Sequence, residues 1–236
     1  MSISENTAVV GERIAAAAQR ASRDPAAITL MAVSKTFPPE AIREAYAAGI
    51  RVFGENRVQE FTGKADAVRG LAEAEWHLIG HLQSNKAARA AELFSAVDTL
   101  DSVKLADRVN SAAEAAGKTM PVLVEINVGG EAGKSGVAPG SAELERILTS
   151  ASQWKSLTIR GLMTVPPYSE NAEESRRFFR QLRETRDTIA ARNLPGVSMH
   201  VLSMGMSHDF EVAIEEGSTC VRVGTAIFGE RQSLQR

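Results

Sequence analysis

The sequence predicts one (β/α)8 barrel domain over residues 1–236, with an extra helix at its N-terminus. Short apolar runs alternate with longer stretches of helical spacing, which is typical of βαβ units and a parallel sheet. Eight such runs occur, and 236 residues lie within the usual size of a single barrel. No Pro-, Gly- or Ser-rich linker divides the chain. The competing arrangement, an open doubly wound sheet, more often has fewer strands.

The predicted strands cover residues 28–36, 50–56, 75–80, 96–100, 120–128, 157–165, 198–205 and a last run within 218–229. Helical stretches separate them. Pro38 and Pro39 open the first of these, and the longest runs from about residue 172 to 192. The segment before Ile28 is an additional helix. We expect it either to cap the barrel or to pack beside its last strand.

Composition excludes several classes of protein. The net charge is −2, with 44% hydrophobic and 24% charged residues, as in an ordinary globular chain. No apolar run approaches the roughly 20 residues of a membrane helix, and Glu5, Glu12 and Arg13 interrupt the stretch that a signal peptide needs. Near-neutral charge and 5% aromatic residues argue against nucleic-acid binding. The lone Cys220 fits a reducing cytoplasm.

Lys35 closes the first predicted strand, and functional residues of such barrels lie where the strands end. Its ammonium could simply reach solvent. Alternatively, a partly desolvated amine has a lowered pKa and can form a Schiff base with an aldehyde. The position of Lys35 alone leaves both interpretations open.

The loops after the seventh and eighth strands, SMGMS (203–207) and VGT (223–225), predict an anion site. Gly205 and Gly224 allow backbone N–H groups to approach an anion closely. Ser203, Ser207 and Thr225 can donate hydroxyl hydrogen bonds. The alternative is structural: Ser207 would cap the following helix and Gly224 would form a tight turn.

Arg222 lies two positions before Gly224 and is therefore expected on the same side of its strand. A buried guanidinium needs an acceptor, which could be a ring nitrogen or a carboxylate of a ligand. An ion pair with Glu55 or Glu125 is the structural alternative.

Two other motifs give weaker indications of function. His77 and His81 lie at a strand end, without the spacing of metal ligands on a helix, so we expect no metal site. The segment GGEAGKSG (129–136) contains Lys134 and Ser135 as a P-loop would, but a loop follows instead of a clear helix. We interpret residues 129–136 as a loop.

Five blocks carry a family resemblance: AVSKT, FGENRVQE, WHLIGHLQSNK, GLMT and LSMGMSHDFEVAIEEGSTCVRVGTAIFG. In this order, over residues 28–229, they resemble the pyridoxal 5′-phosphate (PLP) homeostasis protein family, whose barrel is related to that of alanine racemase. The resemblance implies that Lys35 carries PLP as a Schiff base. Residues of three other strand ends would complete the PLP site, with Asn56 beside the cofactor, Arg222 facing the pyridine nitrogen, and Ser203, Gly224 and Thr225 at the phosphate. Gly205, within the SMGMS block that Ser203 opens, would also contribute to cofactor binding.

The resemblance also implies a cytoplasmic PLP carrier without established catalytic turnover, monomeric or weakly dimeric, that delivers PLP to apo PLP-dependent enzymes. A cationic arginine cannot stabilise a protonated pyridine nitrogen as a carboxylate does, which makes carbanion chemistry harder. The alternatives are a weak single-domain amino-acid racemase, whose larger relatives take a second base from an additional β domain, and an aldolase that uses Lys35 without PLP. We assign no catalytic residue.

Overall fold

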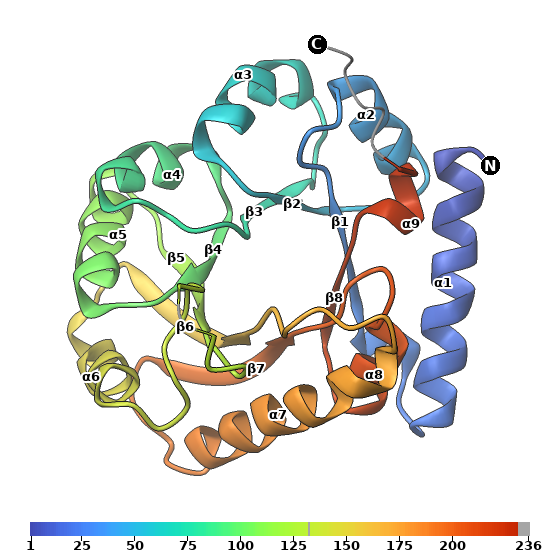
Figure 1. Ribbon diagram of the computed structural model, residues 1–236. Helices are drawn as coiled ribbons and strands as arrows, with labels where there is room; N and C mark the ends of the chain where they lie inside the picture. The colour runs from blue at the N-terminus through green and yellow to red at the C-terminus, as the bar shows by residue number, and fades with distance from the viewer. Residues whose placement is uncertain (132, 231–236) are drawn as a thin grey trace.

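Eight parallel strands form a closed barrel in which each strand pairs with its neighbours in chain order and the eighth pairs with the first (Figure 1). The computed structural model describes residues 1–131 and 133–230. The predicted barrel is confirmed. The predicted domain range of 1–236 includes residues 132 and 231–236, which lie outside the described residues.

The strands are β1 (Thr29–Val33), β2 (Val52–Glu55), β3 (Glu75–Leu78), β4 (Ala96–Leu100), β5 (Met120–Glu125), β6 (Leu157–Met163), β7 (Val197–Ser203) and β8 (Cys220–Val223). The helices are α1 (Ile3–Arg20), α2 (Pro39–Ala47), α3 (Val58–Val68), α4 (Ala87–Leu93), α5 (Val103–Ala115), α6 (Ala142–Ser150), α7 (Arg176–Ala190), α8 (Phe210–Glu215) and α9 (Thr225–Phe228). Short 3-10 turns precede β1 (Pro25–Ala27), α4 (Ser84–Lys86), β6 (Ala151–Gln153) and α7 (Ala172–Ser175).

Several strands end earlier than the sequence predicted, because a turn reverses the chain. β1 stops at Val33 rather than at residue 36, since the Phe37 N–H donates to the Ser34 carbonyl at 3.1 Å and Thr36 adopts a left-handed φ of 67°. β7 stops at Ser203, because Gly205 has a φ of 94°. Both turns lie at the C-terminal end of the barrel.

Helix α1 packs outside the barrel against α2, α8 and α9 (Figure 1). Its buried face includes Val10 and Ile14, and a capping box at Ser2 and Glu5 begins the helix. Because α9 has only four residues, α1 completes the ring of helices beside the last strand, the second of its two expected positions. With 18 residues, α1 is also longer than the 15-residue α7. The prediction of the longest helix at 172–192 was therefore wrong, because that segment begins as a 3-10 turn.

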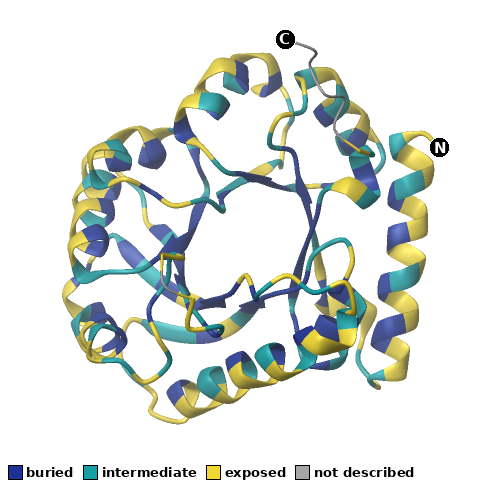
Figure 2. Cartoon of the chain, viewed as in Figure 1, coloured by how far each residue is buried: buried dark blue, intermediate teal, exposed yellow. Residues whose placement is uncertain are grey.

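Most residues of the barrel strands are buried, with exposed positions such as Thr29 and Glu75 at strand starts, whereas the helices expose their outer faces (Figure 2). A parallel sheet covered on both sides requires strands that are apolar throughout, as in β5, where Val122 and Val124 are fully buried. In the described part of the chain, none of the helices has both the length and the apolar character needed to cross a membrane.

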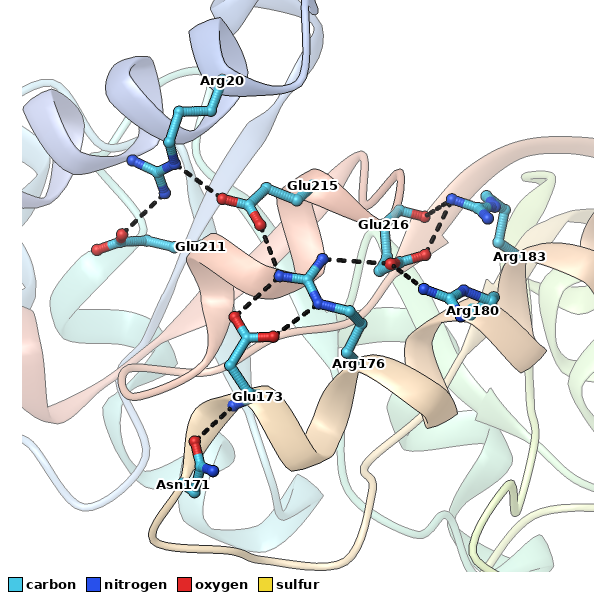
Figure 3. Close-up of polar contacts among 9 residues, drawn as sticks. All are labelled: Arg20, Asn171, Glu173, Arg176, Arg180, Arg183, Glu211, Glu215 and Glu216. Atoms are coloured by element: carbon cyan, nitrogen blue, oxygen red, sulfur yellow. Dashed lines mark hydrogen bonds and ion pairs between the residues drawn. The ribbon is translucent and has the colours of Figure 1, made fainter.

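Charged side chains hold α8 from two sides (Figure 3). Arg20 of α1 donates to Glu215 at 2.8 Å, and Arg176 of α7 donates to the same carboxylate at 2.7 Å. Arg176 also donates to the buried Glu216, to which Arg183 is paired at 3.0 Å. This network therefore anchors the C-terminal end of α8, the helix that follows the 203–207 loop.

Candidate functional site

Lys35 lies in the turn that follows β1 and is half-buried. Two residues earlier, Val33 is close to Gly224 at the end of β8: a Cβ placed on Gly224 would lie 3.5 Å from the Cβ of Val33. β1 and β8 are neighbours, with Ala32 paired to Val223. The turn that carries Lys35 therefore borders the predicted anion loop.

Arg222 is buried inside the barrel, with 4% of its surface exposed. Its Nη1 donates to the Ser203 hydroxyl at 2.6 Å, and its Nη2 donates to the Thr164 carbonyl at 2.7 Å. Burial lowers the pKa of Arg222 from its ordinary value, yet a guanidinium stays charged. Glu55, one of the two glutamates considered as an alternative partner of Arg222, pairs instead with Lys64 at 2.9 Å.

The Ser207 side chain lies beside the predicted anion-binding loop at the end of β8. Its Oγ accepts the backbone N–H groups of Gly224 at 3.2 Å and of Ala226 at 3.4 Å. These two N–H groups therefore converge on one point at the end of β8. Thr225, which lies between them, is exposed at the start of α9.

Ser203, predicted to contact the phosphate, lies deeper in the barrel than Ser207 does, and its phosphate contact stays a prediction. Ser203 is fully buried and its Oγ accepts a hydrogen bond from Arg222, whereas Ser207 Oγ accepts the Gly224 N–H. Gly205 is buried with φ 94°, and a Cβ there would lie 2.6 Å from the Cβ of Ala213. Its carbonyl accepts the Arg222 N–H at 3.0 Å, so Gly205 shapes the turn.

Asn56 follows β2 and is half-buried. A Cβ on Gly80, after β3, would lie 2.2 Å from the Asn56 carbonyl oxygen, so only glycine allows the chain to pass so close. This contact fixes the backbone that carries Asn56 at the same end of the barrel as Lys35.

Glu125 is the last residue of β5, and the Oε2 atom of its carboxylate is buried and lacks a hydrogen-bond partner among the described residues. Burial and, to a lesser extent, Asp101 raise the pKa of Glu125 to about 7, and Arg222 opposes this shift. The pair of Lys64 and Glu55 is similarly buried, directly behind the Lys35 turn. The sequence suggested Glu55 only as a partner of Arg222, and it did not point to Lys64 as a site residue. The one sequence feature that could have indicated Lys64 is its spacing of four residues from Glu60, which is typical of an ion pair on a helix.

His77 lies at the opposite end of the barrel, in a cavity of about 310 Å³ that Glu75, Asp98 and Cys220 also line. His77 Nδ1 is 3.1 Å from Asp98 Oδ2, whereas His81 pairs with Asp101. The two histidines thus have separate partners. Within residues 1–131 and 133–230, no three His, Cys, Asp or Glu side chains are grouped so as to hold a metal ion.

The 129–136 segment is a loop after β5, and its residue 132 lies outside the described residues. Lys134 pairs with Glu131 within the loop itself. Asn127 donates to the Glu131 carbonyl at 3.1 Å. Gly129 packs against Pro167 of the next strand's loop, where a Cβ would lie 2.7 Å from the proline ring.

A closed parallel barrel with a lysine after its first strand and a buried arginine on its last defines a barrel of the alanine racemase type. The alanine racemase N-terminal domain family matches residues 8–232. A pyridoxal phosphate homeostasis protein of Aquifex aeolicus is 46% identical over 232 residues, which are 98% of this chain and 100% of that protein. The chain belongs to the family of pyridoxal phosphate homeostasis proteins, which confirms the resemblance found in the sequence.

Two solved structures are similar over nearly their whole length. An unknown protein from Bifidobacterium adolescentis has a TM-score of 0.86 and 41% identity, and the match covers 95% of this chain and 94% of that one. PipY of Synechococcus elongatus PCC7942, with PLP bound, has a TM-score of 0.80 and 40% identity, with coverages of 93% and 100%.

Proposed function

We propose that this chain binds PLP at the C-terminal end of its barrel, holds it as a Schiff base on Lys35, and buffers or delivers it within the cell. One observation carries this proposal: the Lys35 turn and the amides of Gly224 and Ala226 lie side by side at the ends of β1 and β8. A ligand with an aldehyde at one end and a phosphate at the other suits that arrangement. PipY, the similar protein with PLP bound, supports the choice of ligand.

Each residue contributes one element of binding in this proposal. Lys35 supplies the amine, and Asn56 lies beside the ring. The phosphate is held by Ser207 with the N–H groups of Gly224 and Ala226 and with Thr225 between them, rather than by Ser203, whose buried hydroxyl oxygen accepts a hydrogen bond from Arg222. PLP supplies an aldehyde that condenses with primary amines and a ring that can withdraw electrons.

Arg222 supports a holding function rather than rapid turnover. Its charge is fixed in the barrel by Ser203 and the Thr164 carbonyl. A guanidinium placed against the pyridine nitrogen opposes protonation at that atom, since both would be cationic. The ring then withdraws fewer electrons, and Lys35 holds its ligand without assisting carbanion chemistry.

We place this function in the cytoplasm, in a monomer or weak dimer that passes PLP to apo PLP-dependent enzymes. The single cysteine, Cys220, is a free buried thiol, which suits a reducing compartment.

Borohydride reduction tests the covalent step. The purified protein is incubated with PLP, reduced and digested, and we expect mass spectrometry to find the adduct on the peptide that contains Lys35. Lys35→Ala should abolish this adduct. An adduct on a different lysine, or none in the unaltered protein, would overturn the proposal.

The phosphate assignment is tested with two serine variants and two ligands. Ser207→Ala should weaken PLP binding by about 1–2 kcal/mol, the loss of one hydrogen bond to a charged group, and leave binding of pyridoxal, which has no phosphate, unchanged. Ser203→Ala should weaken both ligands alike, because it acts through Arg222. If Ser203→Ala weakens only PLP and Ser207→Ala weakens both ligands, the phosphate is bound by Ser203 instead.

Delivery is tested separately. The rate of PLP transfer from the loaded protein to an apo-enzyme should exceed the rate at which PLP is released spontaneously.

The racemase alternative is tested by exchange of the α-proton of L-alanine in D₂O. Exchange faster than with free PLP would favour that alternative.

A further inference from the structure

A second lysine lies directly behind the turn that carries Lys35. Lys64, on α3, is buried, with 9% of its side chain exposed. Its Nζ donates to the Ser34 carbonyl at 3.0 Å and to the Phe37 carbonyl at 3.3 Å. Since these carbonyls flank Lys35 on both sides, one ammonium ties the two ends of the turn together.

Two carboxylates complete this cluster. Glu55 Oε1 lies 2.9 Å from Lys64 Nζ and accepts the Ser34 hydroxyl at 2.6 Å. Glu60 Oε1 lies 3.3 Å from the same ammonium and accepts the Thr36 N–H at 2.5 Å. The residues immediately before and after Lys35 are thus both bonded to the cluster.

The backbone of the turn requires such support. Thr36 has a left-handed φ of 67°, which is unfavourable for a β-branched residue. A conformation of this kind persists only where the surrounding structure enforces it. Lys64 and Glu60 supply that constraint, through the Phe37 carbonyl and the Thr36 N–H.

The stability of the fold alone does not account for this cluster. Burial raises the pKa of Glu55, and the Lys64 ammonium offsets only part of that effect. Glu55 Oε2 has no hydrogen-bond partner within the described residues. Apolar residues of similar volume commonly replace such buried ion pairs at no loss of stability. The position of the cluster, around the one turn that bears Lys35, indicates a role there.

We propose that Lys64, together with Glu55 and Glu60, is a positioning residue that holds the Lys35 turn in the geometry needed to bond an aldehyde. This inference rests on the proposed function. In the step it serves, a C=N bond forms between Lys35 Nζ and the aldehyde carbon. The aldehyde oxygen leaves as water with the two hydrogens of the neutral amine. Lys64 touches neither reacting atom and acts through the backbone of residues 34–37.

Two ligands separate this role from a general loss of structure. PLP can bond to Lys35, whereas pyridoxine 5′-phosphate has a hydroxymethyl group in place of the aldehyde and binds without that bond. In Lys64→Met, we expect the dissociation constant for PLP to rise by roughly tenfold or more, because the reactive amine is displaced. The dissociation constant for pyridoxine 5′-phosphate should be unchanged.

Lys118→Met is the matched control. Lys118 also donates to a backbone carbonyl, that of Phe94, at 2.7 Å, but it precedes β5 at the opposite end of the barrel. Its loss should leave both dissociation constants unchanged. If Lys64→Met does not fold, Glu60→Gln is used, since Glu60 lies nearer the surface; it should weaken PLP binding selectively and by less.

Either of two results would overturn the inference. One is that Lys64→Met weakens the binding of PLP and of pyridoxine 5′-phosphate equally; the other is that it leaves the affinity for PLP unchanged. If Lys64→Met does not fold, the same two results are judged with Glu60→Gln. Both are distinct from a failure of the proposed function, in which the unaltered protein forms no reducible adduct on Lys35.

Discussion

His77 shows how neighbouring side chains determine the charge of a single residue in this barrel. Burial alone would lower its pKa, but Asp98 and Glu75 outweigh burial and raise the pKa of His77 to about 10. The imidazole is therefore protonated in the folded protein at neutral pH, whereas in the unfolded chain it titrates near 6.5.

This difference predicts a pH dependence of stability. Below pH 6.5 both states hold the proton, and the stabilisation is fully present; between 6.5 and 10 only the folded state holds it. The free energy of unfolding should therefore lose up to about 1.4 kcal/mol per pH unit across this window through His77. Urea denaturation of the unaltered protein and of His77→Gln measures the effect. Parallel pH profiles for the two proteins would contradict it.

At the residue scale, the sequence predicted which strand ends carry the candidate residues, but not which of their atoms contact one another. The rule that barrel sites lie at the C-terminal ends of strands led to Lys35, Asn56 and Arg222. It could not distinguish Ser203, the last residue of β7, from Ser207 in the turn that follows, because the direction of each hydroxyl depends on the turn at Gly205. Lys64 was missed because its contacts cross from a helix to a turn about 30 residues earlier in the chain.

At the scale of elements, hydrophobic periodicity predicted all eight strands and their order. Strand ends were less well predicted, since a few hydrogen bonds in the following turn decide them, as between Phe37 and Ser34. Helix α7 begins later than predicted, because residues 172–175 form a 3-10 turn capped by Asn171. Hydrophobic periodicity indicates which residues are buried. Because a 3-10 turn and an α-helical turn bury similar faces, periodicity does not show where one changes into the other.

The arginine–glutamate network predicts how firmly α8 is held. Glu216 is almost fully buried and is shared by Arg176, Arg180 and Arg183. Glu216→Ala should lower the free energy of unfolding by about 1–3 kcal/mol, less than for a fully buried pair because the arginines are partly exposed. Denaturation in urea measures this loss, which high salt should reduce. Glu184→Ala, at an exposed glutamate of α7, is the control; an equal loss there would contradict the role of the network.

At the scale of the whole molecule, the first helix packs on the last two, so the two ends of the described chain depend on each other. Two adjacent valines of α1 test this dependence. Val10 is 1% exposed and Val9 is 41% exposed. Val10→Ala should lower the free energy of unfolding by about 1.5–3 kcal/mol, since two buried methyl groups are lost and a small cavity remains.

Val9→Ala removes the same atoms from a solvent-exposed position and should change stability by less than about 0.5 kcal/mol. Thermal denaturation of both variants compares them directly. Similar losses at the two positions would show that α1 contributes through its own helicity and not through its contact with α8 and α9.

The placement of α1 has a consequence for biosynthesis. The ribosome synthesises α1 before any strand of the barrel, whereas α8 and α9, which cover much of its apolar face, follow only after seven strands have been made. The nascent polypeptide must therefore carry Val10 and Ile14 exposed, or sheltered by a chaperone, for most of its elongation. The barrel closes only when β8 pairs with β1, so a polypeptide truncated before α8 would lack both the closing strand and these two partners of α1.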